Sequence, residues 1–189
     1  MSEDAVLALF RESGALLEGH FKLSSGLHSA GYLQCALVLQ HPKHAETMGR
    51  MLGDQLNLLS ATAVLSPALG GLIIGHEVAR ALGVRAIFAE RQEGALSLRR
   101  GFSLGPDDRV IVIEDVVTTG GSTKETMAVA EQAGAQVIAA GSVIDRSGGN
   151  ATLGVPFHAL VTLSLPTYKE EDCPMCRAGT PITKPGSRN

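Results

Sequence analysis

The chain has 189 residues, of which 44% are hydrophobic and only 4% aromatic, and its formal net charge is -3. This length is enough for one domain whose core needs no disulfide or metal to hold it together. The small negative charge gives no whole-protein electrostatic reason to expect nucleic acid or an anionic membrane as a partner.

Features of secreted and membrane proteins are not expected either. The first residues, MSEDAVLALFRESG, lack the basic start and apolar block of a signal peptide. No apolar run approaches the ~18 residues that a membrane-spanning helix requires. Cys35, Cys173 and Cys176 are too few for the disulfide framework of a secreted protein of this size. We therefore expect a cytoplasmic protein without a membrane partner.

The first sixty residues predict two helices with a strand between them. Apolar residues recur close to helical spacing in 4–17, which predicts an amphipathic helix. A Gly- and Ser-containing stretch (19–31) follows, and then an apolar strand candidate, YLQCALVL (32–39). Residues 42–59 again show helical spacing, with Pro42 near the start of that helix.

Short apolar runs then alternate with helices. Strands are expected at 63–66, 84–90, 110–114, 137–144 and 158–165, and helices at about 71–82 and 121–133. Gly83 and Gly134 stand where left-handed C-caps would end these helices. The strand runs are nearly continuous in Val, Ile, Leu and Ala, as in strands that helical crossovers bury on both faces. This order predicts one α/β domain with a mainly parallel sheet, and a tail from Thr167 packed loosely on it.

Residues 110–123, VIVIEDVVTTGGST, are the most informative stretch for function. The strand places Glu114 and Asp115 at its carboxyl end, where ligands bind in an open parallel sheet. Gly120 and Gly121 allow a tight turn, so several N–H groups can meet one anion at the start of the next helix. The turn therefore predicts a phosphate site.

The surrounding side chains narrow the kind of ligand. Hydroxyl groups add hydrogen-bond donors to the turn, at Thr118, Thr119, Ser122 and Thr123. The two carboxylates cannot bind the same phosphate, because like charges repel, and they suit polyol hydroxyls or a metal. Phosphate beside vicinal hydroxyls predicts a ribose 5-phosphate. The alternative is an ordinary Gly-containing turn with solvated acids. A Walker motif and a Rossmann G-x-G-x-x-G motif are both absent from the sequence.

The stretch 110–123 resembles the phosphoribosyl pyrophosphate (PRPP) motif of type I phosphoribosyltransferases. Over nearly its whole length the chain resembles one group of that family, the bacterial orotate phosphoribosyltransferases. The other matching stretches are an orotate-side segment (21–34), a pyrophosphate loop (66–75), a mobile loop (90–102), a strand end with a base-contacting arginine (144–146) and the ending CPMCRAGTPITKPGSR.

The resemblance implies an enzyme that converts orotate and PRPP to orotidine 5′-monophosphate and pyrophosphate, in de novo pyrimidine biosynthesis. It implies Mg²⁺, carried largely by the sugar-diphosphate, with no protein metal ligand. The implied fold is that of type I phosphoribosyltransferases, a mainly parallel central sheet flanked by helices, with a small hood and a mobile loop. One domain would span 1–189, with the N-terminal helix and hood at about 1–40, the core at about 41–165 and the tail at 166–189.

The resemblance also implies the roles of individual residues. Catalytic roles fall to Glu114, Asp115 and Arg91. PRPP would be bound by Arg91, Arg99, Arg100, Glu114, Asp115, Val116, Val117, Thr118, Thr119, Gly120, Gly121 and Ser122. Orotate would be bound by Thr118, Arg146 and Ser24, since its carboxylate matches a guanidinium fork. The pyrophosphate loop is Ala68, Leu69, Gly70 and Gly71, a turn that in this family often holds a cis peptide bond before a residue other than proline.

The segment 91–102 is expected to close over pyrophosphate. In the family this loop reaches into the site of the neighbouring subunit, which implies a homodimer. An ordinary solvated hairpin is the alternative. Ala95 and Gln92 stand where many family members carry lysines. The loss of these cations around pyrophosphate is compatible with four alternatives. The reaction is slower, Arg99 and Arg100 replace the lysines, the substrate has changed, or activity is lost.

Cys173 and Cys176 form a lone C-x-x-C pair. Structural zinc normally needs four ligands, and Cys35 is not a matched second pair, so two ordinary thiols are favoured over zinc shared across a dimer. His28 is expected either to border the orotate site or to be a hydrogen-bonded structural residue. A structural or surface role is the default for His76.

Two other functions remain open. A phosphoribosyltransferase for a purine base would bind orotate weakly and give Arg146 no role. A regulator of the same fold would sense PRPP without turnover and present a basic face to nucleic acid, against which the net charge of -3 counts.

Overall fold

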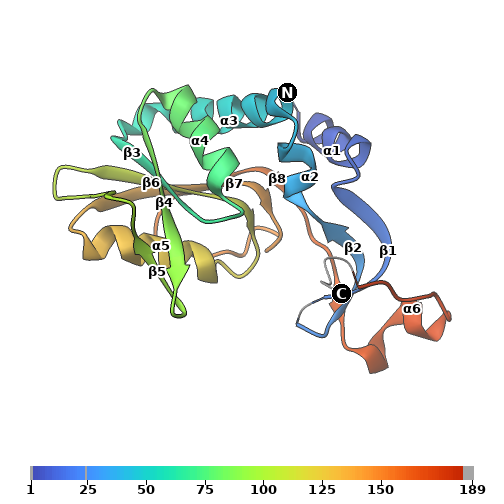
Figure 1. The fold of residues 1–189 in the computed structure, drawn as a ribbon. Coiled ribbons are helices and arrows are strands. Elements are labelled where there is room, and N and C mark those ends of the chain that lie inside the picture. Colours follow the sequence, from blue (N-terminus) through green and yellow to red (C-terminus); the bar gives the residue numbers. More distant parts are fainter. Residues whose placement is uncertain (1, 24, 185–189) are drawn as a thin grey trace.

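The structure, a computed structural model, describes residues 2–23 and 25–184. Its strands form two sheets (Figure 1). The larger sheet contains β3 (Ala63–Pro67), β4 (Arg85–Gln92), β5 (Ala95–Leu98), β6 (Arg109–Val117), β7 (Gln136–Asp145) and β8 (Phe157–Thr162). The smaller sheet contains β1 (Leu16–Lys22), β2 (His28–Leu33) and β9 (Thr167–Tyr168).

The larger sheet has the order β5-β4-β3-β6-β7-β8. All neighbours in it pair in parallel except β4 and β5, which form an antiparallel hairpin. From β3 the chain first adds β4 on one side and later β6 on the other. The strand order therefore reverses between β3 and β6, and in open α/β sheets the crevice beyond the carboxyl ends of the strands at such a point is where ligands bind.

Helices cover both faces of the larger sheet (Figure 1). On one face lie α3 (Pro42–Leu56) and α4 (Leu72–Leu82), and on the other lies α5 (Gly121–Gln132). Successive residues of β6 alternate between the two cores, since Ile111 and Ile113 pack with α3 and α4 while Val110 and Val112 pack with α5. All four are fully buried. The unbroken apolar run of β6 is thus explained by a strand with two buried faces.

The smaller sheet, here called the hood, is built from both ends of the chain. The helix α1 (Glu3–Glu12) precedes the β1–β2 hairpin, and β9 pairs with β2 from the C-terminal side. The chain continues through the 3-10 helix η2 (Glu170–Asp172) and the short helix α6 (Pro174–Arg177). Figure 1 shows this tail beside the hairpin, at the end away from the larger sheet.

Most predicted elements are confirmed to within a few residues, but the hood region was predicted wrongly. The strand candidate 32–39 is in fact the end of β2 followed by the helix α2 (Cys35–Leu39). Cys35, Val38 and Leu39 are buried together, with the spacing of one helix face. The stretch 19–31, for which no strand was predicted, lies mostly in β1 and β2.

Two boundaries and the packing of the tail also differ from the prediction. The first helix ends at Glu12, so Leu16 and Leu17 belong to β1. The helix expected at 42–59 splits into α3 and the 3-10 helix η1 (Asn57–Leu59). The tail is not loosely packed, because Cys173 is fully buried and residue Thr183 forms a bridge with Phe21 of β1.

Gly83 and Gly134 both have left-handed backbone conformations, with φ of 70° and 87°, directly after α4 and at the end of α5. The predicted C-caps are therefore confirmed. None of the helices in the described part of the chain combines the length and the apolar character needed to cross a bilayer.

Candidate active site

Glu114 and Asp115 lie in the last part of β6, three and two residues before its final residue, Val117. The strand thus runs further than the sequence predicted, and the acids stand within its end rather than after it. Glu114 is 5% exposed. Its Oε2 accepts a hydrogen bond from Ser122 Oγ at 3.2 Å, which ties the first turn of α5 to the acid pair. The carboxylate of Asp115 accepts a hydrogen bond from the Val116 N–H at 2.8 Å.

The two carboxyl groups are electrostatically unusual. Burial, and after it the neighbouring charge of Asp115, raises the pKa of Glu114 to about 8. Burial also raises the pKa of Asp115. A ligand that donates hydrogen bonds to these groups, or brings a cation to them, would favour their charged forms and so lower both pKa values. The pair is therefore poised to interact with hydroxyl groups or with a cation-bearing ligand.

The turn between β6 and α5 has the form expected of a phosphate site. Gly120 adopts a left-handed conformation with φ of 78°, and a β-carbon there would lie 2.7 Å from Leu153 Cδ2. Thr118, Thr119 and Ser122 are exposed. No side chain caps the N-terminus of α5, so its first N–H groups are not taken up by a capping side chain. Backbone donors and hydroxyls thus face the solvent at a helix start.

A second turn, between β3 and α4, lies directly beside the acid pair. A β-carbon on Gly70 would lie 2.8 Å from Asp115 Oδ1, and one on Gly71 would lie 2.9 Å from the carbonyl oxygen of Ile113. The peptide bond between Ala68 and Leu69 is cis, as the resemblance implied for this turn. The structure therefore brings the predicted pyrophosphate loop and the predicted ribose-binding acids together, at the point where the strand order reverses.

Arg146 follows β7, and its backbone N–H donates to the Val117 carbonyl at 2.7 Å. This bond fixes Arg146 beside the end of β6. Its side chain is partly buried, and its Nε has no hydrogen-bond partner among the described residues. Burial lowers the pKa of Arg146, an effect that the nearby Tyr32 phenol opposes, and a guanidinium stays charged in proteins. An unsatisfied cationic donor here is suited to an anionic ligand.

Tyr32 is a site neighbour that the sequence did not indicate. It belongs to β2, so the hood supplies it, and its proximity to Arg146 depends on how the hood sits on the larger sheet. Ser24, which the resemblance placed near orotate, lies outside the described residues.

The segment 91–102 is a hairpin rather than an extended loop. Gln92 pairs with Ala95, and the turn between them holds Glu93 and Gly94 with positive φ. Arg91 binds Glu125 of α5, and Arg100 binds Glu90 through two hydrogen bonds of 2.8 Å each. Arg91 and Arg100 are thus held by acids outside the pair Glu114 and Asp115.

Comparison with known proteins identifies the family. The family model described as phosphoribosyl transferase domain matches residues 38–153. The chain is 54% identical to an orotate phosphoribosyltransferase of Carboxydothermus hydrogenoformans, covering 95% of both chains. It is 50% identical to an orotate phosphoribosyltransferase of Pelotomaculum thermopropionicum, covering 100% of this chain and 99% of that protein.

Solved structures show the same fold. The crystal structure of orotate phosphoribosyltransferase from Aeropyrum pernix has a TM-score of 0.70 and 26% identity, and the match covers 84% of this chain and 93% of that one. A Mycobacterium tuberculosis orotate phosphoribosyltransferase in complex with PRPP has a TM-score of 0.66 and 19% identity, with coverage of 85% and 96%.

Proposed function

The chain belongs to the phosphoribosyl transferase family and, within it, to the orotate phosphoribosyltransferases, and on this premise we propose how its residues divide the work of the reaction. It is a pentosyltransferase that converts orotate and PRPP to orotidine 5′-monophosphate and pyrophosphate. The observation that carries the proposal is the contact of Gly70 with Asp115. Together with the Ser122–Glu114 hydrogen bond, it supports a single crevice shared by the pyrophosphate turn, the acid pair and the phosphate turn.

In this proposal the 5′-phosphate of PRPP binds the turn from Thr118 to Ser122. The exposed hydroxyls and the uncapped start of α5 supply donors to its oxygens. The ribose hydroxyls then donate to Glu114 and Asp115. The pyrophosphate group lies toward Gly70 and Gly71, where backbone atoms approach the acid pair closely and leave no space for a side chain.

Orotate binds on the side of Arg146. Its carboxylate is a planar anion that fits the geometry of a guanidinium group, and the Nε of Arg146 is partly buried without a partner in the described residues. Thr118 lies on the same edge of the sheet, because the Arg146 N–H bonds to Val117. This position lets Thr118 contact both substrates.

The displacement at C1′ passes through a state with positive charge on the ribose. The chain's contribution is to hold orotate in line with the bond that breaks and to place negative charge beside the developing cation. Hydrogen bonds from the ribose hydroxyls lower the raised pKa of Glu114, so the carboxylate is charged when the reaction needs it. Arg91, Arg99 and Arg100 neutralise the departing pyrophosphate once the β4–β5 hairpin closes.

Mg²⁺ is the cofactor in this proposal. One buried and one partly buried carboxyl group, both with raised pKa values, fit a substrate that arrives with a divalent cation, since a cation nearby favours their charged forms. Bound to PRPP, the ion would reduce the charge of the leaving pyrophosphate. No residue of the chain needs to be a dedicated ligand, because magnesium commonly binds through substrate phosphates and water.

The enzyme acts as a homodimer in this proposal, with the hairpin of one subunit closing over the site of the other. The support is the resemblance of residues 90–102 to a loop that crosses between subunits, together with the pairing of Arg91 with Glu125 and of Arg100 with Glu90, which engages both cations with acids other than Glu114 and Asp115. The cytoplasmic location stays a prediction from the sequence.

The deciding experiment mixes purified protein with PRPP, Mg²⁺ and orotate and follows the loss of orotate absorbance. Turnover that needs all three components is expected. Turnover with adenine or hypoxanthine in place of orotate would contradict the proposed base. PRPP binding without any turnover would favour a regulator instead.

A further inference from the structure

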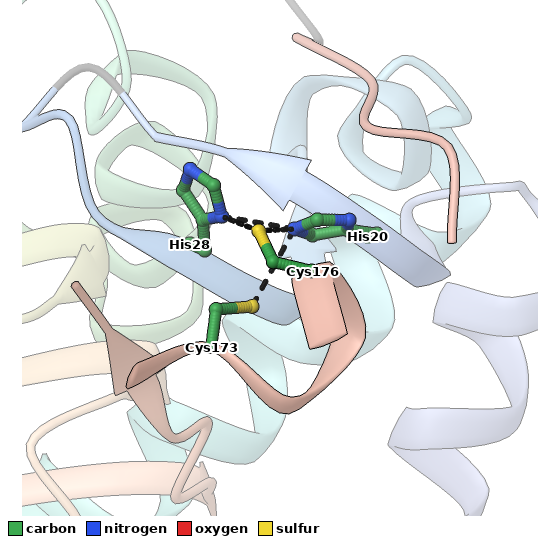
Figure 2. A group of neighbouring side chains, drawn as sticks. All are labelled: His20, His28, Cys173 and Cys176. Carbon is green, nitrogen blue, oxygen red and sulfur yellow. Dashed lines mark hydrogen bonds between the residues drawn. The ribbon is translucent and has the colours of Figure 1, made fainter. Parts of the chain in front are cut away.

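Four side chains of metal-binding type meet in the hood, apart from the acid pair and its turns. His20 and His28 come from the β1–β2 hairpin, and Cys173 and Cys176 come from the C-terminal tail. Figure 2 shows one nitrogen of each histidine and both sulfur atoms pointing toward a common centre. These four atoms all lie within 4.8 Å of one another. Neither histidine nor the C-x-x-C pair has a role in the reaction proposed above.

Four of the six distances between these atoms are close to the edges of a small tetrahedron. His20 Nε2 lies 2.9 Å from His28 Nδ1, and Cys176 Sγ lies 3.2 Å from the same nitrogen. His20 Nε2 lies 3.5 Å from Cys173 Sγ and 3.7 Å from Cys176 Sγ. A zinc ion with Zn–N bonds of about 2.05 Å and Zn–S bonds of about 2.3 Å gives tetrahedral edges of roughly 3.3 Å for N–N and 3.6 Å for N–S.

The hydrogen bond of His20 Nδ1 determines that the lone pair of this ring is on Nε2. Nδ1 lies 2.8 Å from the carbonyl oxygen of Thr180, and since that oxygen can only accept, Nδ1 carries the proton. Nε2 of the neutral ring then presents a lone pair to the cluster. A backbone carbonyl that orients the far nitrogen is the usual arrangement of a metal-bound histidine.

In either tautomer of His28, hydrogen bonds within the cluster leave a repulsion or an unpaired donor. If both thiols donate to the histidines, the bare nitrogens of His20 and His28 face each other at 2.9 Å. If His28 Nδ1 donates to His20, neither cysteine has a free nitrogen to donate to within the cluster. A cation at the centre removes the conflict, because all four atoms then act as ligands.

The surroundings favour a closed, structural site. His20, His28 and Cys173 are buried, and Cys176 is partly buried at a cleft that His20, Lys22 and Glu170 also line. This cleft gives an ion a route from solvent. Two nitrogens and two thiolates are a donor set that suits zinc, and the two thiolate charges balance the charge of the ion.

We propose that His20, His28, Cys173 and Cys176 form a structural Zn²⁺ site that fastens the C-terminal tail to the β1–β2 hairpin. Four protein ligands leave no position for a substrate, so the ion acts on the structure and not on the chemistry. The hairpin carries Tyr32 toward Arg146 at the C-terminal end of β2. The zinc site therefore stiffens the hairpin that carries Tyr32. The proposal does not depend on the reaction assigned above, because it uses none of the same residues.

The test measures metal in the untagged full-length protein. We expect one zinc per chain by elemental analysis. After exchange to Co²⁺, we expect the visible absorption of a tetrahedral thiolate site. Cys173→Ser combined with Cys176→Ser should remove the metal and this spectrum. Cys35→Ser is the matched control, since this thiol is buried outside the cluster, and it should keep full metal content.

A second measurement does not depend on how the variants fold. Treating the wild-type protein with a strong chelator should speed tryptic cleavage at Lys169 and Arg177, both exposed residues of the tail, by about tenfold or more relative to the rest of the chain. Three results would overturn the site: no metal after incubation with Zn²⁺, a Cys173–Cys176 disulfide in the isolated protein, or unchanged metal content in the double cysteine variant.

Discussion

Arg91 and Glu125 form a two-point ion pair, in which Nη1 lies 2.9 Å from Oε1 and Nη2 lies 2.6 Å from Oε2. The same Glu125 carboxylate accepts the Leu96 N–H at 3.0 Å, so it holds the β4–β5 hairpin at two places. The pair raises the pKa of Arg91 and lowers that of Glu125. A hairpin that is to close over pyrophosphate has to give up these bonds first.

Glu125→Gln should therefore ease closure. We expect the KM for PRPP to fall by a small factor, on the order of two- to fivefold, because exposed ion pairs are weak. Steady-state kinetics with varied PRPP would measure it. Glu77→Gln is the control, since Glu77 accepts two hydrogen bonds from Arg80 on α4, both at Oε2. An equal effect in both variants would show that the change is not specific to the hairpin.

Glu114→Gln combined with Asp115→Asn should abolish most of the activity while the protein stays folded. The expected loss of kcat is about a hundredfold or more, because preorganised charge near the reacting carbon is removed. Turnover of orotate and the thermal midpoint would be measured together. Glu131→Gln, on the exposed side of α5, should leave both unchanged. Near-normal turnover in the double variant would remove the central assignment.

The raised pKa of Glu114 predicts a pH-dependent stability. The folded protein holds this proton up to about pH 8, whereas the unfolded chain loses it near pH 4.5. The folded state thus binds more protons between these values, and the carboxyl group lowers stability progressively as the pH rises through this window. The Tm of Glu114→Gln minus that of the wild type should grow from pH 5 to pH 8, reaching roughly 5 to 10 °C. A constant difference across the range would contradict the buried, protonated carboxyl.

Arg146→Gln should weaken orotate selectively. Loss of a charge-assisted contact to the carboxylate is expected to raise the KM for orotate by about 10- to 100-fold, with the KM for PRPP changed little. Separate titrations of the two substrates would distinguish these effects. Arg50→Gln, a change at an exposed arginine of α3, serves as the control. A rise confined to the KM for PRPP would place Arg146 on the other substrate.

Mixing two inactive variants tests the crossing hairpin. Arg91→Ala and Asp115→Asn should each be nearly inactive alone. If the hairpin completes the neighbouring site, an equilibrated equimolar mixture should recover about one quarter of wild-type activity, because half of the dimers are mixed and each has one intact site. No recovery, although mixed dimers are present by mass spectrometry of differently labelled subunits, would show that each subunit completes its own site.

The core of the fold was predictable because its strands are buried on both faces. The side chains of Val110 to Ile113 point alternately into two cores, so this strand is an unbroken apolar run. Such a run, with a helix on either side of it in the chain, can be recognised from the sequence alone. The hood was not predictable in the same way. Leu16 and Leu17 continue a helical spacing although they lie in β1, and the two residues of β9 are too short to leave a pattern.

In the site, too, local features were predictable and contacts between distant segments were not. The motif could be found directly because its acids, Glu114 and Asp115, and its Gly120–Gly121 turn are close in sequence. Their residue types alone indicate hydroxyl and phosphate binding. The contact of Gly70 with Asp115 follows only from the strand order. The meeting of His20 with Cys173 depends on packing between residues 153 positions apart, which no local pattern encodes.

The same separation has a consequence for how the protein is made. At a ribosomal rate of about 5 to 20 residues per second, roughly 8 to 30 seconds pass between the synthesis of His20 and that of Cys173. During this time the β1–β2 hairpin has no third strand, and the edge of β2 that later receives β9 is open to other chains. The hood can be completed only after the tail leaves the ribosome. Slow release of the nascent chain would therefore extend the period in which this edge is exposed to aggregation.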